Sequence, residues 1–349
     1  MSAVAQTRLA GSEMIHMARL MKRGGVQAVR NHIGGRDHAH LRLASTNPPV
    51  VLAAYGDFQW RLNSLFRDAP LTLVYVFYWA FNAKAAEAYV DDIRRRLEAF
   101  PNHRIIAACN EREMQEHFER AGVESVLCSH NAFVDERLFC PDPAVQRRYD
   151  AIYNAALAPY KRFELASKIE SIALITYAWA GTHSADYEEK TRSLLKHAYW
   201  ANDVLKGGGK LAPAEIASIY RQARVGLCLS ETEGAMYASM EYLLSGLPVV
   251  STPSRGGRDL FWNDKFVRVV EPNPDAVREA VFELASANLD PTMVRETTLA
   301  EVKRHRARLD EALARTGAKI EYPWAPGSHG ALTYMSFQEL FETYRRTRA

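Results

Sequence analysis

The segment from residue 229 to residue 252, LSETEGAMYASMEYLLSGLPVVST, contains the clearest fold signal in the chain. It continues an apolar run that predicts a strand over Val225–Ser230, and the polar residues up to Gly234 predict a flexible turn. A helix is expected over Ala235–Leu244, with Gly246 just beyond its end, and the β-branched run Pro248–Thr252 predicts another strand. A strand, a turn, a helix and a strand in this order are typical of a parallel α/β sheet.

The same alternation of short apolar runs and amphipathic helical stretches covers most of the chain, which predicts repeated βα units. In the first half we expect strands at Val50–Tyr55, Leu71–Phe77, Arg104–Cys109 and Ser125–Ser129, and helices at Ala83–Phe100 and Arg112–Ala121. In the second half we expect strands at Ala151–Ala155, Ile172–Ala178, Val225–Ser230, Pro248–Thr252 and Phe266–Glu271, and helices at Lys161–Ile169, Asp186–His197, Pro213–Ala223 and Ala235–Leu244. Two more helices are expected in the tail, at Pro291–Arg315 and Ser336–Arg348.

The chain of 349 residues is longer than most single cores, so we expect two domains. Pro141 and Pro143, followed by a polar stretch through Arg148, indicate the linker between them. The predicted fold class is α/β, with two Rossmann-like domains that face a central cleft. We place the first domain, with an abbreviated first βα unit, at residues 1–142 and the second at residues 143–330. Residues 331–349 are expected to form a C-terminal helix that packs back on the first domain.

Charge and composition exclude several classes of protein. The 44 basic and 41 acidic residues leave a net charge of +3, which is too small to indicate nucleic acid as the main partner. The four cysteines form no CxxC pair, which favours reduced thiols in a cytoplasmic protein. Residues 1–10 lack the pattern of a signal peptide, and the longest apolar run, Leu71–Phe81, is shorter than the roughly 20 residues that cross a bilayer. The basic helical stretch Met14–Arg30 leaves peripheral contact with the inner face of a membrane open beside a solvated role.

Glu233, Lys161 and Arg162 are predicted to lie just after strands, at the edge where open parallel sheets bind ligands. Glu233 stands at the entrance of the predicted helix and Glu241 eight residues later, a separation of about 12 Å at the helical rise. Carboxylates accept hydrogen bonds from hydroxyl groups, and a nucleotide sugar carries hydroxyl groups at both ends. Its diphosphate needs cations, which Lys161 and Arg162 provide at the start of another predicted helix. This division of charge predicts a site for a nucleotide-diphosphate sugar.

These residues resemble the Glu-x7-Glu signature of retaining GT-B glycosyltransferases, in particular the family 4 enzymes among the glycosyl transferases group 1. The similarity continues into the Gly256-Gly257 loop, includes the Lys161-Arg162 segment, and extends to the interdomain stretch Asn131–Asp135. The resemblance implies that Glu233 is the catalytic residue at the donor sugar, that Glu241 binds the ribose, and that Lys161 and Arg162 hold the diphosphate. It also implies that Gly234, Ala235 and Met236 contribute to donor binding.

The resemblance further implies a reaction. A hexosyl unit passes from the nucleotide-diphosphate sugar, which is a co-substrate, to a hydroxyl of a glycan, a lipid-linked molecule or a small molecule. The anomeric configuration is retained, and neither a metal nor another cofactor is implied. The first domain is then the acceptor domain and the second the donor domain.

Two regions depart from the family pattern. Ala155–Ala158 occupies the place where many members have an arginine before the lysine, and the aromatic residues of Tyr75–Phe81 stand where members often have a histidine. These departures keep two other functions open: a nucleotide-sugar 2-epimerase of the same fold, and a nucleotide-sugar-binding protein without catalysis. Asp37–His40 is interpreted as a polar loop rather than a metal site, because no further ligands accompany its two histidines. The role of His130, which follows a strand, stays open between the cleft and a local cap.

Overall fold

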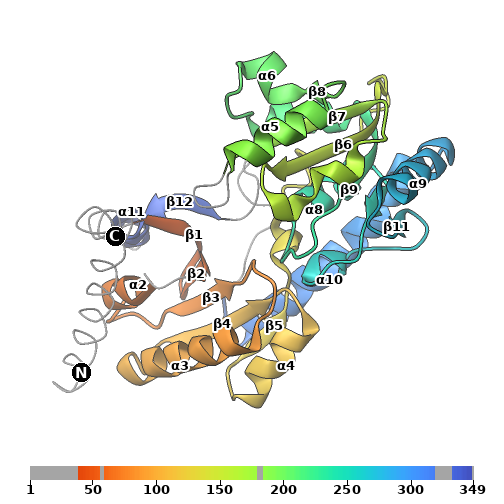
Figure 1. Ribbon diagram of the computed structural model, residues 1–349. Coiled ribbons are helices and arrows are strands. Elements are labelled where there is room, and N and C mark those ends of the chain that lie inside the picture. Colours follow the sequence, from red (N-terminus) through yellow and green to blue (C-terminus); the bar gives the residue numbers. More distant parts are fainter. Residues whose placement is uncertain (1–37, 56–58, 179–183, 319–331, 348–349) are drawn as a thin grey trace.

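The computed structural model describes residues 38–55, 59–178, 184–318 and 332–347, and these form two lobes, each built on a six-stranded sheet (Figure 1). The first sheet has the strand order β12-β1-β2-β3-β4-β5. Its strands are β1 (His38–Thr46), β2 (Pro49–Ala54), β3 (Thr72–Val76), β4 (Arg104–Cys109), β5 (Ser125–Leu127) and β12 (Thr333–Ser336). Strands β2 to β5 are mutually parallel, whereas β1 is antiparallel to both β2 and β12.

Both faces of the first sheet are covered. One face packs against the helices α2 (Gln59–Leu65), α3 (Ala83–Ala99), α4 (Arg112–Arg120) and α11 (Phe337–Arg346). Val51 and Leu73 belong to this core, whereas their neighbours Val50 and Val74 belong to a second core that continues to α10 (Pro291–Ala314). Because successive side chains of a strand point to opposite faces, this division shows that the parallel strands are buried on both sides.

The second sheet has the order β11-β10-β9-β6-β7-β8, and all of its pairs are parallel. Its strands are β6 (Tyr149–Ala156), β7 (Ile172–Tyr177), β8 (Tyr199–Trp200), β9 (Ala223–Cys228), β10 (Val249–Ser251) and β11 (Val267–Val269). Its helices are α5 (Ala185–Leu194), α6 (Ala201–Lys206), α7 (Pro213–Tyr220), α8 (Tyr237–Leu244) and α9 (Pro274–Ser286). In chain order the strands run 6-5-4-1-2-3, which is the order of a Rossmann sheet.

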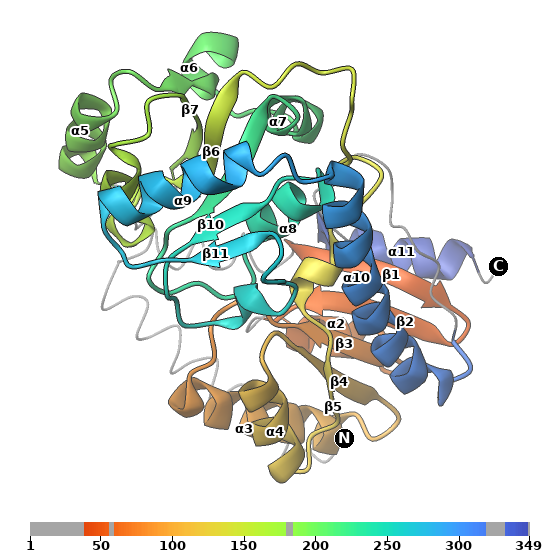
Figure 2. The same cartoon turned by 90° about the vertical axis from the view of Figure 1, so that its right-hand side faces the viewer.

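The long helix α10 connects the lobes. It packs against α8 in the second lobe and against β5 and the 3₁₀ turn His130–Phe133 in the first, and Figure 2 shows it running along both. Its Arg306 forms an ion pair with Glu136, whose side chain is largely buried, and Arg295 donates hydrogen bonds to the carbonyls of Phe139 and Leu244. The interdomain stretch is therefore held by α10.

Most of the expected elements are present within one to three residues of their predicted limits. The expected helix Lys161–Ile169 is wrong: this region forms two 3₁₀ turns, Pro159–Lys161 and Phe163–Ala166. Arg162 between them has a φ of 52°, a left-handed conformation that a right-handed helix does not contain. Strands β1, β8 and β12 and helices α2, α6 and α9 were not expected. Helix α11 returns to the first lobe, where it contacts β1 and α2.

Some sequence-based expectations concern residues outside the described ranges. The abbreviated first βα unit and the basic stretch Met14–Arg30 lie within residues 1–37, so the structure does not address them. The domain limits at residues 142 and 330 stay predictions. The change of sheet falls between β5 and β6, on either side of residue 142. Within the described ranges, no helix is both long enough and apolar enough to cross a membrane.

Candidate functional site

The strand order of the second sheet reverses between β6 and β9, which are paired in parallel although two strands separate them in the chain. In open α/β sheets a ligand binds outside the carboxyl ends of the strands at such a reversal, because the connections leave in opposite directions there. The segment after β6 leads to Lys161 and Arg162, and the segment after β9 leads to Glu233. The reversal thus brings together three of the residues that the sequence singled out.

Lys161 and Glu233 form an ion pair at this point. The Lys161 side chain is only 5% exposed and that of Glu233 is 16% exposed, so the pair is largely withdrawn from solvent. The Ser230 hydroxyl donates a second hydrogen bond to the same carboxylate oxygen, at 2.7 Å. From the sequence, Lys161 is expected to bind the diphosphate and Glu233 the sugar as separate charges, whereas in this structure the two groups satisfy each other.

Arg162 is held differently from the sequence-based expectation. It does not stand at a helix N-terminus, since 3₁₀ turns replace the expected helix. Its Nε donates to the Leu229 carbonyl at 2.7 Å, and its Nη2 donates to the Thr252 hydroxyl at 2.7 Å. Both acceptors follow neighbouring strands of the sheet, so the guanidinium joins the three segments that leave β6, β9 and β10.

Arg258 is a residue of this site that the sequence analysis missed. Its guanidinium is fully buried and donates to the carbonyl and hydroxyl of Ser230, to the Ser251 hydroxyl and to the Thr252 carbonyl, at 2.7–3.1 Å. Among the described residues it makes no ion pair with a carboxylate. The one available signal was its position directly after Gly256-Gly257, which the resemblance already connected to the donor site.

The charges around this turn do not balance. Three cations, Lys161, Arg162 and Arg258, make hydrogen bonds around the turn. Glu233 pairs with Lys161 and shares Ser230 with Arg258, whereas Arg162 bonds to the Leu229 carbonyl and Glu231 of the same turn is exposed. Burial raises the pKa of the nearby Cys228 thiol to about 12, and the charges of Arg258, Glu233 and Lys161 all act on it. Because a buried cation without a counter-charge gains strongly from an anion, this excess suits a phosphate group.

Glu233 and Glu241 are not on one helix as expected. Helix α8 begins at Tyr237 with Met236 as its N-cap, so Glu233, Gly234 and Ala235 lie in the preceding turn and the 12 Å helical spacing does not apply. Glu241 lies on α8 and is 2% exposed. It accepts a hydrogen bond from the Tyr220 hydroxyl at 2.7 Å, and burial together with this carboxylate raises the pKa of Tyr220.

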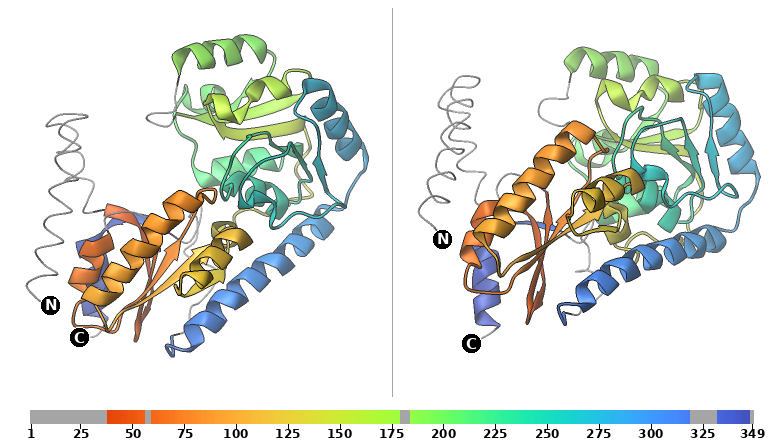
Figure 3. Two further views of the ribbon diagram at one scale, coloured as in Figure 1. Left: turned by 60° about the horizontal axis from the view of Figure 1, so that its bottom comes forward. Right: turned by 90° about the horizontal axis from the view of Figure 1, so that it is seen from below.

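The first lobe packs directly on the turn that contains Glu233. A Cβ atom on Gly234 would lie 2.1 Å from the Tyr78 carbonyl oxygen and 2.7 Å from the Trp79 Cα. A Cβ atom on Gly257 would lie 2.1 Å from the Asn110 carbonyl oxygen. Both glycines are therefore required for the close approach of two backbones. Figure 3 shows the two lobes meeting where the β3–α3 connection approaches the second lobe.

His130 lies at the same junction, which answers the question that the sequence left open. Its ring stacks on Tyr237, at the start of α8, with centroids 3.8 Å apart, and it is 5.9 Å from the ring of Tyr78. Burial, followed by the charge of His40, lowers the pKa of His130 to about 3. The imidazole is therefore neutral at physiological pH and serves as an aromatic contact between the lobes.

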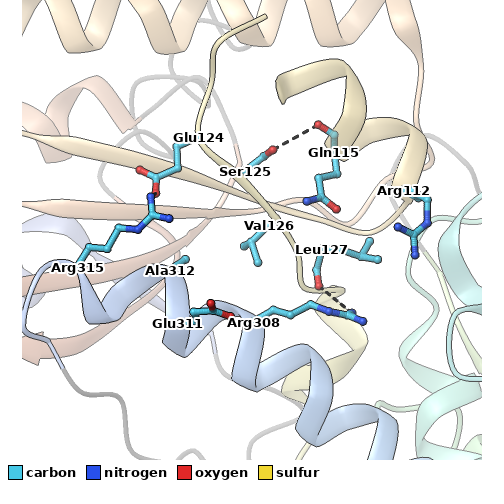
Figure 4. Close-up of a pocket in the computed structure, with 10 residues that line it drawn as sticks. All are labelled: Arg112, Gln115, Glu124, Ser125, Val126, Leu127, Arg308, Glu311, Ala312 and Arg315. Carbon is cyan, nitrogen blue, oxygen red and sulfur yellow. Dashed lines mark hydrogen bonds and ion pairs between the residues drawn. The ribbon is translucent and has the colours of Figure 1, made fainter. Parts of the chain in front are cut away.

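Two cavities lie elsewhere. The larger, about 380 Å³, is bordered by α4, β5 and α10 (Figure 4). Two of its three basic side chains, Arg315 and Arg308, contact Glu124 and the Leu127 carbonyl respectively. It includes no residue of the turn at Glu233. The smaller, about 260 Å³, lies in the first lobe and is mostly aromatic. No cluster of three or more metal-ligating side chains occurs in the described part of the chain, and His38 and His40 contact the ring of Tyr334 in β12.

Known proteins resemble this chain in sequence over part of the second lobe and in fold over both lobes. The sequence model of the family "Glycosyl transferases group 1" matches residues 164–287. A search of curated protein sequences gave no match. Anabaena HepE, solved with UDP and also with UDP and glucose, is similar in structure, with TM-scores of 0.52 and 0.51 and 14% sequence identity. The two alignments cover 74% and 72% of this chain, and 75% and 76% of HepE.

A glycosyltransferase from Rickettsia africae is also similar, with a TM-score of 0.50, 13% identity and 76% of each chain covered. Sequence identities of 13–14% between this chain and these solved structures establish a shared fold alone. The match to the family model rests instead on the sequence of the second lobe. Residues 164–287 are therefore similar in sequence to the glycosyl transferases group 1, and the two lobes together have the fold of GT-B glycosyltransferases.

Proposed function

We propose that this protein transfers a hexosyl unit from a nucleotide-diphosphate sugar to an acceptor hydroxyl, with retention of the anomeric configuration. The observation that carries the proposal is the excess of cations at the point where the second sheet reverses its strand order. Lys161, Arg162 and Arg258 converge there with Glu233. Such a group of cations next to one carboxylate suits a ligand with an anionic centre and a hydroxyl-rich end.

Donor binding is proposed to exchange the partners of the Lys161–Glu233 ion pair. The ammonium group turns to the diphosphate, and the released carboxylate accepts hydrogen bonds from the hydroxyls of the donor sugar. The backbone of Gly234, Ala235 and Met236 then borders the sugar, and Glu241 binds the ribose. Because Glu241 is buried beneath the junction of the lobes, the donor enters after the lobes have moved apart.

The same cations account for the chemistry. As the bond between the anomeric carbon and the diphosphate breaks, negative charge grows on the leaving phosphate oxygens, and preorganised cations stabilise that charge. Glu233, close to the anomeric carbon in this proposal, interacts with the positive charge that develops on the sugar. The acceptor oxygen bonds to the anomeric carbon on the face from which the diphosphate leaves, and the proton of the acceptor hydroxyl passes to the departing phosphate oxygen. Closure of the lobes excludes water. The proposal includes no metal and no cofactor besides the donor.

Two other functions use the same fold and are separated by product analysis. A nucleotide-sugar 2-epimerase returns an epimer of the sugar without transferring it to an acceptor, and a binding protein releases no product. The absence of an arginine at Ala155–Ala158 motivates the second alternative, but Arg258 supplies a buried cation from another segment. This compensation favours the transferase.

The test is a panel of nucleotide-diphosphate sugars, screened by thermal shift and then assayed for free nucleotide with and without acceptors. UDP-glucose is the first donor to try, because Anabaena HepE was solved with UDP and glucose. We expect one donor to raise the unfolding temperature and to release nucleotide in proportion to added acceptor. An epimerised sugar, or binding without any product across the panel, would contradict the transferase.

A further inference from the structure

The aromatic cavity of the first lobe has a lining without charge. It measures about 260 Å³ and lies where β3 ends and α3 begins. It is lined by Tyr55, Phe77, Tyr78, Trp79, Ala80, Phe81, Asn82, Ala85, Ala86, Tyr89, Met114 and Phe118. All of these residues belong to the described part of the chain, and none of them is acidic or basic.

Two of the polar groups at the cavity are already used within the protein. The Tyr55 hydroxyl donates a hydrogen bond to Asp92 at 3.0 Å, and the Asn82 side chain accepts one from the backbone of Ala85 at 3.1 Å. The remaining polar side-chain atoms of the lining are few, among them the Tyr78 hydroxyl and the Trp79 indole nitrogen, whereas each hydroxyl of a buried sugar ring needs a partner. An apolar ring has no such requirement, so the lining favours an apolar ring over a sugar.

Three aromatic rings of the cavity wall pack against one another. Tyr55 stacks on Phe77 with centroids 4.9 Å apart, and Tyr89 lies 4.4 Å from Tyr55. Rings at these separations attract one another beyond the effect of their buried area. An apolar cavity of about 150 Å³ binds benzene, so 260 Å³ leaves room for a substituted or fused ring.

The position of the cavity connects it to the donor site. Residues Tyr78, Trp79 and Ala80 line the cavity, and the same short segment packs against Gly234 and Gly256. Gly256 in turn lies against the carbonyl of Glu233. One segment of three residues therefore separates the cavity from the turn of Glu233.

We propose that this cavity binds the non-reacting part of the acceptor, and that this part is a neutral aromatic or other apolar ring. The reacting hydroxyl then lies beyond the segment Tyr78–Ala80, toward the turn of Glu233. The assignment of the ligand as an acceptor rests on the proposed transferase function. Binding of the ring itself depends only on the cavity.

The experiment fills the cavity from α3. Ala85 lines the cavity in the first turn of α3, whereas Ala88 lies exposed on the same helix and does not line it. Ala85→Phe and Ala88→Phe are therefore the same chemical change at a cavity position and at a control position. The probe is 2-naphthol, a neutral fused ring with one hydroxyl, titrated by saturation-transfer NMR into the full-length protein. Glucose, a neutral ring covered with hydroxyls, is the comparison probe.

We expect 2-naphthol to bind the unmodified protein and Ala88→Phe with equal affinity, and Ala85→Phe at least tenfold more weakly. Glucose is not expected to bind in the cavity, so any glucose binding should be the same in the unmodified protein and in Ala85→Phe. Trp79→Ala, which removes an exposed wall of the cavity and so preserves the fold, is expected to weaken 2-naphthol at least threefold. Equal affinity of 2-naphthol for both Phe variants, or no binding to the unmodified protein, would overturn the proposal.

A UDP titration of the same samples separates this proposal from the proposed function. If UDP binds normally but Ala85→Phe does not weaken the binding of 2-naphthol, the proposal that this cavity binds the acceptor is wrong and the proposed transferase function stands. A cavity-dependent signal from 2-naphthol in a protein that binds no nucleotide diphosphate overturns the transferase and leaves the ring site in place.

Discussion

Gly234 is the residue at which the close contact between the two lobes can be perturbed most directly. In Gly234→Ala the new methyl group would lie 2.1 Å from the Tyr78 carbonyl oxygen, whereas Cβ atoms are essentially never closer than 3.0 Å to a heavy atom. The segments must therefore separate by at least 0.9 Å, the difference between these two distances. Overpacking of this kind costs about 1–3 kcal/mol, and a displacement of about 1 Å near reacting groups can reduce the rate about a hundredfold.

The control is Gly209→Ala, since both glycines have backbone angles that alanine adopts without strain. A methyl group on Gly209 meets no atom closer than 3.1 Å, so we expect that variant to change the unfolding free energy by less than about 0.5 kcal/mol. Urea unfolding reports the stability, and transfer of labelled sugar reports the rate. If Gly234→Ala unfolds and turns over like Gly209→Ala, the close contact between the lobes does not exist in solution.

Two further predictions concern the junction and the donor site. The pKa of His130 is lowered to about 3 from an ordinary 6.5, so below pH 6.5 the unfolded chain binds a proton that the folded protein excludes, and stability is lost as the pH falls. Between pH 7 and pH 5 the protonation of His130 in the unfolded chain lowers the free energy of unfolding by about 2 kcal/mol. His130→Phe keeps a stacked ring, so in urea unfolding its free energy of unfolding should fall by about 2 kcal/mol less over this pH range. The same pH dependence in both proteins would show that the pKa of His130 is not lowered. Glu241→Gln keeps an acceptor for Tyr220 and should leave the urea midpoint nearly unchanged, while calorimetry should show about tenfold weaker binding of the nucleotide sugar. Unchanged affinity would remove Glu241 from the donor site.

Local sequence was sufficient for the elements whose ends are set by neighbouring residues. Helix α8 ends at Leu244 and is followed by its C-cap Ser245 and by Gly246, which has a φ of 75°; the backbone N–H of Leu247 donates to the Tyr242 carbonyl. This is the Schellman arrangement that a glycine after a helix predicts. Strands β2 to β7 and β9 to β11 were likewise predicted from short apolar runs between turn residues.

Other features depend on contacts between distant segments. Strand β1 pairs with β12 almost 300 residues later, and no local pattern announces that pairing. The segment after β6 was expected to be a helix, but Arg162 adopts a left-handed conformation while its guanidinium bonds to Leu229 and Thr252. Tertiary hydrogen bonds outweigh local helix propensity here.

The candidate site was predictable in its location but not in its bonding. The resemblance over the Glu233 segment pointed to the edge of the sheet where Lys161, Arg162 and Glu233 converge. The ion pair between Lys161 and Glu233 joins residues 72 positions apart, and the burial of Arg258 follows only from its contacts with Ser230, Ser251 and Thr252. Such partners become visible only once the strands have been ordered.

The central claim is that the cations at the reversal of the second sheet bind a diphosphate. Isothermal titration of UDP and of uridine into the unmodified protein, Lys161→Ala and the control Lys168→Ala tests it most directly, because Lys168 forms an exposed ion pair with Asp275. A charge-assisted hydrogen bond is worth about 1.5–3 kcal/mol, so Lys161→Ala should weaken UDP at least about tenfold while uridine changes by less than about twofold and Lys168→Ala changes neither. Equal losses for UDP and uridine in Lys161→Ala, or no binding of UDP to the unmodified protein, would contradict the claim.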